Sequence, residues 1–559
     1  MSRKSRRMFP PIVPKAREWP VVRLSRHRAE FIEEVIEESY ARHIKKHSTK
    51  ASLREEIETT MYRERMRIKG VPWKVDPPDQ KEFWNNIKKQ LVDSAAEKSQ
   101  QKEQEIMRSI ISRFTNEIAG NFNRTRYRLA RSLVTNGFRR LLNASKLKTI
   151  TGAITGKHTL LDKIQITGEL EQLRALASKG TIVMVPTHFS NIDSVLVAWV
   201  IYELGLPPFI YGAGLNLFNI GIFAYFMNSV GAYKVDRRKK NAVYLETLKT
   251  YSTLSIQKGC HSLFFPGGTR SRSGKIENAL KMGLLGTAIE AQRKTYQDLE
   301  NGIIEEAQKV YIVPVTLNYN FVLEAPILIR GYLESKGQER FYYDLDEYSN
   351  SYKIFTFLLK FFTKDAQISV SVGRALNLVG NPVDEHGDCY DKHGNIIDSK
   401  EYFMSEGKVT ENPQREQEYT RMLSKVIVKE FHIINRVMAS HLVAFVGFRL
   451  FRKQFPKLDL YNFFRLEEDL VIPYEEYLAN FQIVKSEVLL LHSKGKVGIS
   501  DEIKLPDSEV IDIGITNVGL YQVVRPITMN KEGNIISSDL TSLFYYHNRM
   551  DGYDLEKLI

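Results

Sequence analysis

Between residues 160 and 380 the chain alternates seven short, strand-like stretches with longer helical ones. Short runs rich in β-branched and aromatic residues predict strands, and strands that alternate with helical patterns are typical of an α/β fold. We therefore predict a mixed central sheet flanked by helices, within a domain of residues 151–380. The expected strands cover residues 163–167, 181–185, 209–212, 232–235, 261–265, 310–316 and 367–373.

The second stretch, residues 181–185, is followed by His188 and then by Asp193. Ser190 or Asn191 is expected to cap an apolar helix that starts nearby. Ligands in α/β folds bind at the carboxyl edge of the sheet, where a carboxylate can orient a histidine that takes a proton from an alcohol. The spacing alone is weak evidence, because such a pair is more often a helix cap and a surface residue.

A loop of glycines, hydroxyls and cations follows the fifth stretch, with the sequence Phe-Pro-Gly-Gly-Thr-Arg-Ser-Arg-Ser-Gly-Lys at residues 265–275. Arginine can donate two hydrogen bonds to phosphate oxygens, and lysine adds a point charge. Glycine lets backbone amides approach the phosphate closely. The spacing is not that of a P-loop, because Ile276 stands where a magnesium-binding hydroxyl would be. The predicted phosphate contacts are Gly268, Thr269, Arg270, Ser271, Arg272 and Lys275.

These two blocks resemble those of a known family. His-Phe-Ser-Asn-Ile-Asp resembles the HxxxxD block of glycerolipid acyltransferases, and the loop resembles their FPEGTRSRSG block. Gly231 and Arg237 match a GxxxxxR block between them, and Val-Pro-Val-Thr at residues 313–316 resembles a fourth. The resemblance implies that Pro314 of this fourth block contacts the substrate. The best match is the glycerol-3-phosphate and dihydroxyacetone-phosphate branch, whose similarity extends thinly to residue 549.

The resemblance implies a glycerolipid acyltransferase-like fold and acyl transfer from acyl-CoA or acyl carrier protein to the sn-1 hydroxyl of glycerol 3-phosphate. His188, assisted by Asp193, is expected to deprotonate that hydroxyl, with no metal and no cofactor beyond the acyl donor. The residues expected to hold the phosphate are Arg237, Arg270, Arg272 and Lys275. Dihydroxyacetone phosphate or 1-acylglycerol 3-phosphate as acceptor would use the same constellation. Backbone amides at the helix start after His188 are candidate oxyanion donors.

Position 267 departs from the family pattern, because glycine stands where the FPEGTRS block has glutamate. An acid beside two arginines would orient them or bind the acceptor. Either another acid, with Glu277 and Glu324 the nearest candidates, fills the gap, or the loop carries more positive charge and suits a different acceptor.

The formal net charge of +14 predicts an anionic partner, which could be nucleic acid, anionic lipid or a phosphorylated substrate. Residues 1–28 carry nine Lys or Arg against one Glu, so we expect a flexible basic arm that is solvated or attracted to an anionic membrane. The rival function is a nucleic-acid-binding protein. No regular pattern of basic and aromatic residues supports it, so we predict no nucleic-acid partner.

Three further regions complete the expected organisation. Residues 29–150 show helical periodicity and form an accessory domain, and residues 381–559 form a mixed C-terminal extension. Apolar stretches at 194–233, 355–362 and 441–448 are either core or a surface that dips into one leaflet, because none is an uninterrupted span. We therefore expect peripheral or monotopic attachment to the cytoplasmic side of the cell membrane.

Cysteine and histidine usage argues against other site types. Only two cysteines are present, Cys260 and Cys389, too few for a disulfide framework, so a reducing compartment is expected. Residues 384–398 mix acids, histidines and one cysteine with turn residues, a pattern that predicts a hairpin tip in preference to a metal site.

Overall fold

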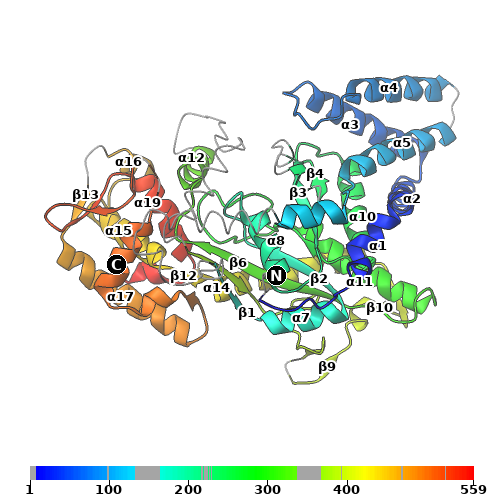
Figure 1. Ribbon diagram of the computed structural model, residues 1–559. Coiled ribbons are helices and arrows are strands. Elements are labelled where there is room, and N and C mark those ends of the chain that lie inside the picture. Colours follow the sequence, from blue (N-terminus) through cyan, green and yellow to red (C-terminus); the bar gives the residue numbers. More distant parts are fainter. Residues whose placement is uncertain are drawn as a thin grey trace, which may run out of the picture.

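The fold is taken from a computed structural model of the 559-residue chain. It describes residues 8–96, 100–132, 164–215, 230–336, 367–391, 393–466, 470–520 and 524–559, with the single residues 218, 224, 225, 227 and 522. Figure 1 shows a strand layer in the middle of the molecule, the N-terminal helices at one end and the C-terminal helices at the other.

A seven-stranded sheet forms the centre of the molecule, in the order β1-β7-β6-β2-β5-β3-β4. Five neighbouring strands from β6 to β4 are parallel, whereas β7 pairs antiparallel with β6 and parallel with β1. All seven predicted strands are confirmed, as is the mixed α/β class. Their bounds are β1 Ile164–Gly168, β2 Thr181–Pro186, β3 Ile210–Gly214, β4 Tyr233–Val235, β5 Ser262–Leu263, β6 Val310–Tyr319 and β7 Ile368–Val372.

Helices cover both faces of the sheet, and β2 is buried along its whole length between them. Alternate β2 residues point to opposite faces. Val183 and Val185 pack in one apolar cluster with α11 (Met282–Glu300) and α14 (Pro413–Ile434). Ile182 and Met184 belong to the second cluster, with α7 (Leu170–Lys179) and α8 (Asp193–Glu203). Burial on both faces explains why β2 reads as a continuous apolar run.

Three of the N-terminal helices, α2, α3 and α5, pack against α10 (Ala242–Gln257), and the predicted break at residues 70–78 separates α3 from α4. The N-terminal helices are α1 Pro20–Arg26, α2 Arg28–Lys46, α3 Lys50–Ile68, α4 Gln80–Ala96 and α5 Gln100–Ile118. In Figure 1, α3, α4 and α5 lie at the upper right, with α2 and then α1 below them. The domain boundaries at 28, 150 and 380 remain predictions.

The expected flexible arm is wrong for residues 8–28. Val21 and Val22 of α1 are buried, and the amides of Phe9 and Ile12 donate to backbone carbonyls at the end of α8. The high density of Lys and Arg obscured these apolar residues, which pack while the cations stay in water. Residues 1–7 lie outside the described part of the chain.

The C-terminal region forms a helical layer beside the sheet, in which α17, α18 and α19 pack around α15. The bounds are α15 Ala439–Gln454, α16 Leu460–Phe463, α17 Tyr474–Ser493, α18 Asp507–Asn517 and α19 Leu540–His547, preceded by α12 Ala325–Ser335 in the sheet region. The region also contains two small sheets, one of β12 and β14 and one in the order β13-β16-β15. The bounds of these strands are β12 Arg436–Val437, β13 Leu470–Ile472, β14 Gly498–Ile499, β15 Thr528–Met529 and β16 Ile535–Ser537.

The apolar run at 441–448 lies inside α15 and is buried, so it belongs to the core and does not form a membrane-facing surface. Residues 355–362 lie outside the described part of the chain. The hairpin predicted within 384–398 is present, formed by β8 Cys389–Tyr390 and β9 Ile396–Ile397. The other short strands are β10 Met404–Ser405 and β11 Lys408–Val409. Of the helices in the described residues, none has both the length and the apolar character needed to cross a membrane.

Candidate active site

The carboxyl ends of the five parallel strands meet at one edge of the sheet, and the predicted blocks lie there. His188 follows β2, the loop from Phe265 follows β5, and Arg237 follows β4. The end of β6 reaches the same edge at Tyr319. Segments that are far apart in sequence therefore meet where α/β folds bind their ligands.

His188 and Asp193 form a hydrogen-bonded pair, with 2.8 Å between His188 Nδ1 and Asp193 Oδ2. Asp193 is fully buried, and it also accepts the backbone amides of Phe189 at 2.7 Å and Ser190 at 2.9 Å and the hydroxyl of Tyr319. Because a carboxylate oxygen is the partner at this bond, Nδ1 of His188 is the donor, and Nε2 is the ring nitrogen left to act as a base.

Two expectations about the start of α8 are wrong. The N-cap residue is Ile192, without a side-chain cap, because the carboxylate of Asp193 itself accepts the amides of the preceding turn. The amide of Asn191 donates to Glu324 Oε1 at 3.0 Å. Since the amides of Phe189, Ser190 and Asn191 are all engaged, they are not available to a developing oxyanion.

The arginine loop is joined directly to the histidine. The amide of Ser271 donates to the carbonyl of His188 at 2.7 Å, and the rings of His188 and Phe265 stack with centroids 4.1 Å apart. Gly268 closes a tight turn with φ +80°, a left-handed conformation that favours glycine. The two blocks are therefore held as one unit.

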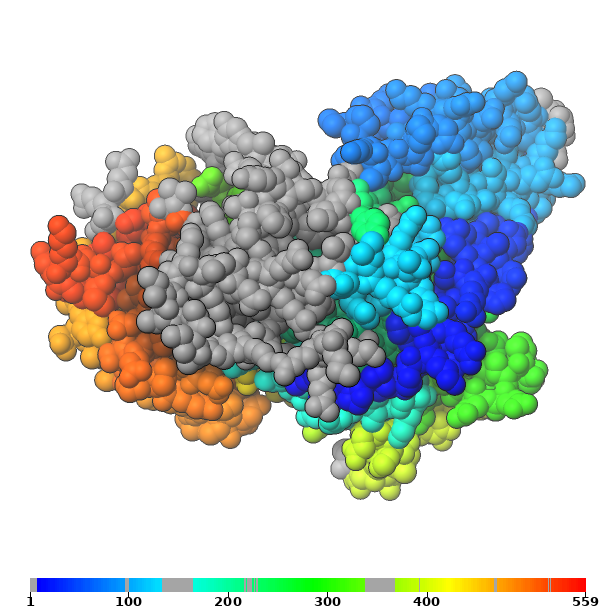
Figure 2. Space-filling model, viewed as in Figure 1, coloured from blue at the N-terminus to red at the C-terminus, as the bar shows by residue number. Residues whose placement is uncertain are grey.

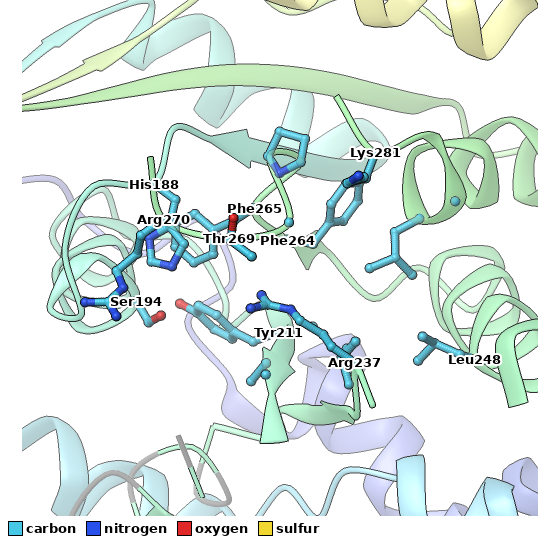
Figure 3. A pocket seen from close by; sticks show the side chains of 18 of the residues that line it. His188, Ser194, Tyr211, Arg237, Leu248, Phe264, Phe265, Thr269, Arg270 and Lys281 are labelled. Carbon is cyan, nitrogen blue, oxygen red and sulfur yellow. The ribbon is translucent and has the colours of Figure 1, made fainter. Parts of the chain in front are cut away.

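A cavity of about 460 Å³ opens beside His188. Figure 3 shows Arg237 and Tyr211 reaching into it from the side opposite the loop that carries Thr269 and Arg270. Five of the described lining residues are cationic and none is Asp or Glu; the cations are Arg237, Lys249, Arg270, Arg272 and Lys281. Apolar side chains line other parts of the wall, namely Met227, Val235, Leu245, Leu248, Phe264, Phe265, Leu284 and Leu328.

The cationic wall is only partly neutralised. Arg270 Nη1 lies 3.5 Å from Glu324 Oε1, whereas neither Arg237 nor Arg272 forms an ion pair with any residue that the structure describes. Burial, and then the charge of Arg270, lower the pKa of the Arg237 guanidinium. A bound anion would relieve this repulsion, so the cavity favours a negatively charged ligand.

Both acids considered for the place of a glutamate at 267 lie close to the site. Glu324 is buried and accepts the Ser190 hydroxyl at 3.1 Å. Glu277 Oε1 accepts the amide of His188 at 3.2 Å. Burial raises the pKa of the Glu277 carboxyl to about 7, with a further increase from Asp193, against the opposing effects of the His188 amide and Arg549.

The comparisons with known proteins agree with this geometry. Residues 164–318 match the family model described as Acyltransferase. The region from β1 to β6 is therefore similar to acyltransferase domains.

Several curated proteins similar to this region have glycerol-3-phosphate acyltransferase in their names. A protein of Pseudoalteromonas atlantica named "Glycerol-3-phosphate acyltransferase" is 27% identical over 258 residues, which are 46% of this chain and 27% of that protein. One of Alteromonas mediterranea with the same name is 32% identical over 176 residues, 31% of this chain and 20% of its own. A Caenorhabditis elegans protein, "Probable glycerol-3-phosphate acyltransferase, mitochondrial", is 31% identical over 30% of this chain and 23% of its own. These matches span at most about a quarter of each relative.

The region from β1 to β6 brings together most of the predicted site residues. His188, Arg237, Gly268, Thr269, Arg270 and Arg272 line the cavity, and Asp193 lies behind His188.

Three predicted contacts lie outside the described lining. The Ser271 hydroxyl donates to the carbonyl of Lys275, and the ammonium of Lys275 lies 3.0 Å from Asp551. Pro314 is a sheet residue opposite Val185. These side chains support the loop and the strand layer and do not contact the cavity.

Sequence reasoning missed several residues around the candidate site. Tyr319, at the end of β6, holds Asp193, and Tyr211 lines the cavity from β3. Their only signal in the sequence was a tyrosine near the end of a strand. Arg549 comes from the C-terminal region, is buried, and lies with its guanidinium carbon 3.9 Å from the ring centroid of Phe189.

The C-terminal region also fixes the arginine loop. Asn548 Nδ2 donates to the carbonyl of Ser273 at 2.8 Å. A Cβ at Gly274, which has φ +81°, would lie 2.1 Å from the carbonyl oxygen of Tyr545, so only glycine permits this approach. The loop is therefore clamped between the sheet edge and a segment from the far end of the chain.

Proposed function

We propose that this protein transfers a fatty acyl group from acyl-CoA or acyl carrier protein to the sn-1 hydroxyl of glycerol 3-phosphate, forming lysophosphatidate. The observation that carries the proposal is the cavity beside His188, whose described lining has five cationic side chains and no carboxylate. A general base beside such a wall suits an alcohol that carries a phosphate. The names of the curated relatives support the same acceptor.

His188 Nε2 takes the proton from the acceptor hydroxyl as its oxygen attacks the thioester carbonyl of the acyl donor. The carbon–oxygen ester bond forms, the carbon–sulfur bond breaks, and the thiolate leaves with the proton that His188 returns. Asp193 accepts from Nδ1 and stabilises the imidazolium that forms in between. No step calls for a metal or for a cofactor beyond the acyl donor.

Arg237, Arg270 and Arg272 bind the acceptor phosphate, with Lys249 and Lys281 at the same wall. Binding energy from this remote dianion orients the hydroxyl toward His188. The apolar part of the lining, with Leu248 and Leu284, receives the first methylene groups of the acyl chain.

Dihydroxyacetone phosphate and 1-acylglycerol 3-phosphate carry the same phosphate beside a hydroxyl, and they are the alternative acceptors. Purified protein assayed with acyl-CoA and with acyl carrier protein against all three acceptors tests the proposal. We expect the highest kcat/KM with glycerol 3-phosphate. No acyl transfer to any of the three would refute acyl transfer, and preference for another acceptor would correct the substrate.

We also propose peripheral or monotopic attachment to an anionic membrane on the cytoplasmic side of the cell membrane. A cluster of cations surrounds a surface hollow of about 620 Å³ next to Trp19, formed by Lys15, Arg17, Arg124, Arg128 and Arg131. Figure 2 shows the dark-blue N-terminal helices on the same face as the cyan segment that precedes residue 133. Each basic residue close to an anionic surface contributes about 1 kcal/mol.

Co-sedimentation with phosphatidylcholine vesicles, with and without phosphatidylglycerol, tests the membrane proposal. Binding should require phosphatidylglycerol and should weaken as salt is raised. Replacing Arg124 and Arg128 by Glu should weaken it further. Equal binding to neutral vesicles, or unchanged binding by this variant, would contradict the electrostatic attachment.

A further inference from the structure

Glu277 lies directly behind the histidine that begins the His188–Asp193 turn. Its Oε1 accepts the backbone amide of His188 at 3.2 Å. Although part of the residue reaches the surface, its other carboxyl oxygen, Oε2, is buried and has no hydrogen-bond partner among the described residues. A carboxylate is costly to bury, so its place against the His188 backbone calls for a reason.

Gly267 lies against the same carboxyl. A Cβ built on residue 267 would lie 2.9 Å from Glu277 Cγ and 3.0 Å from Oε1, and its three nearest neighbours all belong to Glu277. The φ of Gly267 is outside the left-handed region, so its backbone does not require glycine. The surrounding space favours glycine, because the Glu277 side chain occupies the place that a Cβ would take.

We propose that Glu277 is a positioning residue for His188, and that glycine is favoured at position 267 because the Glu277 carboxyl fills the place of a side chain there. The inference rests on the proposed acyl transfer, since positioning is measured through turnover. It gives a physical reason for the departure at position 267, where the resembled block carries glutamate. The carboxylate is kept beside the histidine, but residue 277 supplies it.

Glu277 is positioned to act through the backbone. The His188 amide lies at the start of the turn, where it donates to Glu277. The imidazole of the same residue stacks on Phe265 and is hydrogen-bonded to Asp193. Fixing this peptide limits how far the imidazole can rotate or shift away from the acceptor hydroxyl. Small displacements of a reacting group reduce turnover steeply, so a single acceptor at this peptide has a measurable effect on kcat.

The first test compares Glu277→Ala with Glu277→Gln. Alanine removes the acceptor of the His188 amide, and we expect kcat to fall by about tenfold or more, with the acceptor KM changed by about twofold or less. Glutamine retains a carbonyl oxygen at the same place, so it should keep kcat within about threefold of wild type. An unchanged kcat in the alanine variant, or an equal fall in both, would overturn the positioning role.

The second test is a double-mutant cycle on stability, which needs no activity. Gly267→Ala should lower the unfolding midpoint by about 1–3 °C in wild type, because its Cβ meets Glu277. The same change in the Glu277→Ala background should cost little. Gly331→Ala is the matched control, since a Cβ there meets nothing within 4 Å. An equal cost of Gly267→Ala in both backgrounds would overturn the shared space.

The two tests separate the inference from the proposed function. If wild-type protein transferred no acyl group to any acceptor, the proposed function would fail, and the stability cycle would still report on the pair of residues 267 and 277. If wild type were active and the cycle showed no coupling, the inference alone would fail.

Discussion

The two ends of the cavity differ in how their polar groups are satisfied. At the His188 end, Asp193 accepts four donors, and Glu277 and Glu324 each hold a backbone amide of the same turn. At the cationic end, Arg237 and Arg272 form no ion pair with a described residue. The first arrangement fixes geometry before substrate binds, and the second leaves charge for the substrate to neutralise. Damage at the two ends should therefore affect different kinetic constants.

The largest effect is expected from the fixed end. His188→Ala and Asp193→Ala should each lower kcat by about a hundredfold or more, because one removes the base and the other its orientation. Steady-state kinetics with saturating acceptor measures this, and circular dichroism checks that both variants fold. Near-wild-type kcat in either variant would mean that the pair is not the base.

A smaller effect is expected at the cationic end. Arg237→Ala and Arg270→Ala should each raise the acceptor KM by roughly tenfold to a hundredfold, since a charge-assisted hydrogen bond contributes about 1.5–3 kcal/mol. The donor KM should move less.

Lys275→Ala is the matched control for the two arginine variants. Its ammonium pairs with Asp551 outside the cavity, and it should shift the acceptor KM by less than about fivefold. Equal changes in donor and acceptor KM for the arginine variants would place the carrier's phosphates at this wall instead.

Tyr319→Phe tests how far the fixed end depends on one bond. The change removes the hydroxyl that donates to Asp193 while leaving the ring in the core. Because three other donors to Asp193 remain, kcat should fall by only about threefold to tenfold, with KM unchanged. A loss as large as that of Asp193→Ala would show that the tyrosine acts in the chemistry itself.

The smallest expected effect is a change in the pH dependence of stability. Burial raises the pKa of Glu277 to about 7, so the protonated carboxyl favours the folded state. This contribution to the free energy of unfolding is fully present below about pH 4.5 and is lost as pH rises through 7. Two charged groups also act on the pKa of Glu277: Arg549 lowers it and Asp193 raises it, while the hydrogen bond from the His188 amide lowers it. Melting curves from pH 5 to 8 should show a smaller loss of stability in Glu277→Gln than in wild type. Parallel curves for the two proteins would contradict the raised pKa.

The sequence predicted the parts of the molecule that depend on local pattern. Short runs of β-branched and aromatic residues marked all seven strands, and the order of the motifs located His188, Asp193 and the arginines at one sheet edge. The pairing of Lys275 with Asp551 could not be predicted, because a cation in a basic loop gives no sign of a partner so far along the chain. Residues 8–28 were misjudged because their net charge obscured Val21 and Val22.

The remaining features depend on contacts between distant parts of the chain. Tyr319 reaches Asp193 across 126 positions, and Arg549 lies over Phe189 from the C-terminal region. Glu277 was one of two candidates for the place beside residue 267, and only the packing of its side chain against Gly267 distinguishes it. No periodicity or spacing encodes such contacts.

The central claim is that the acceptor phosphate binds the cationic wall while its hydroxyl meets His188. The most direct test is the ratio of kcat/KM for glycerol 3-phosphate to that for glycerol, measured in wild type, Arg270→Ala and Lys275→Ala. We predict that the ratio falls by about tenfold or more in Arg270→Ala and stays close to the wild-type value in Lys275→Ala. A ratio that is equal in wild type and Arg270→Ala would contradict the account, because the phosphate would then be bound elsewhere.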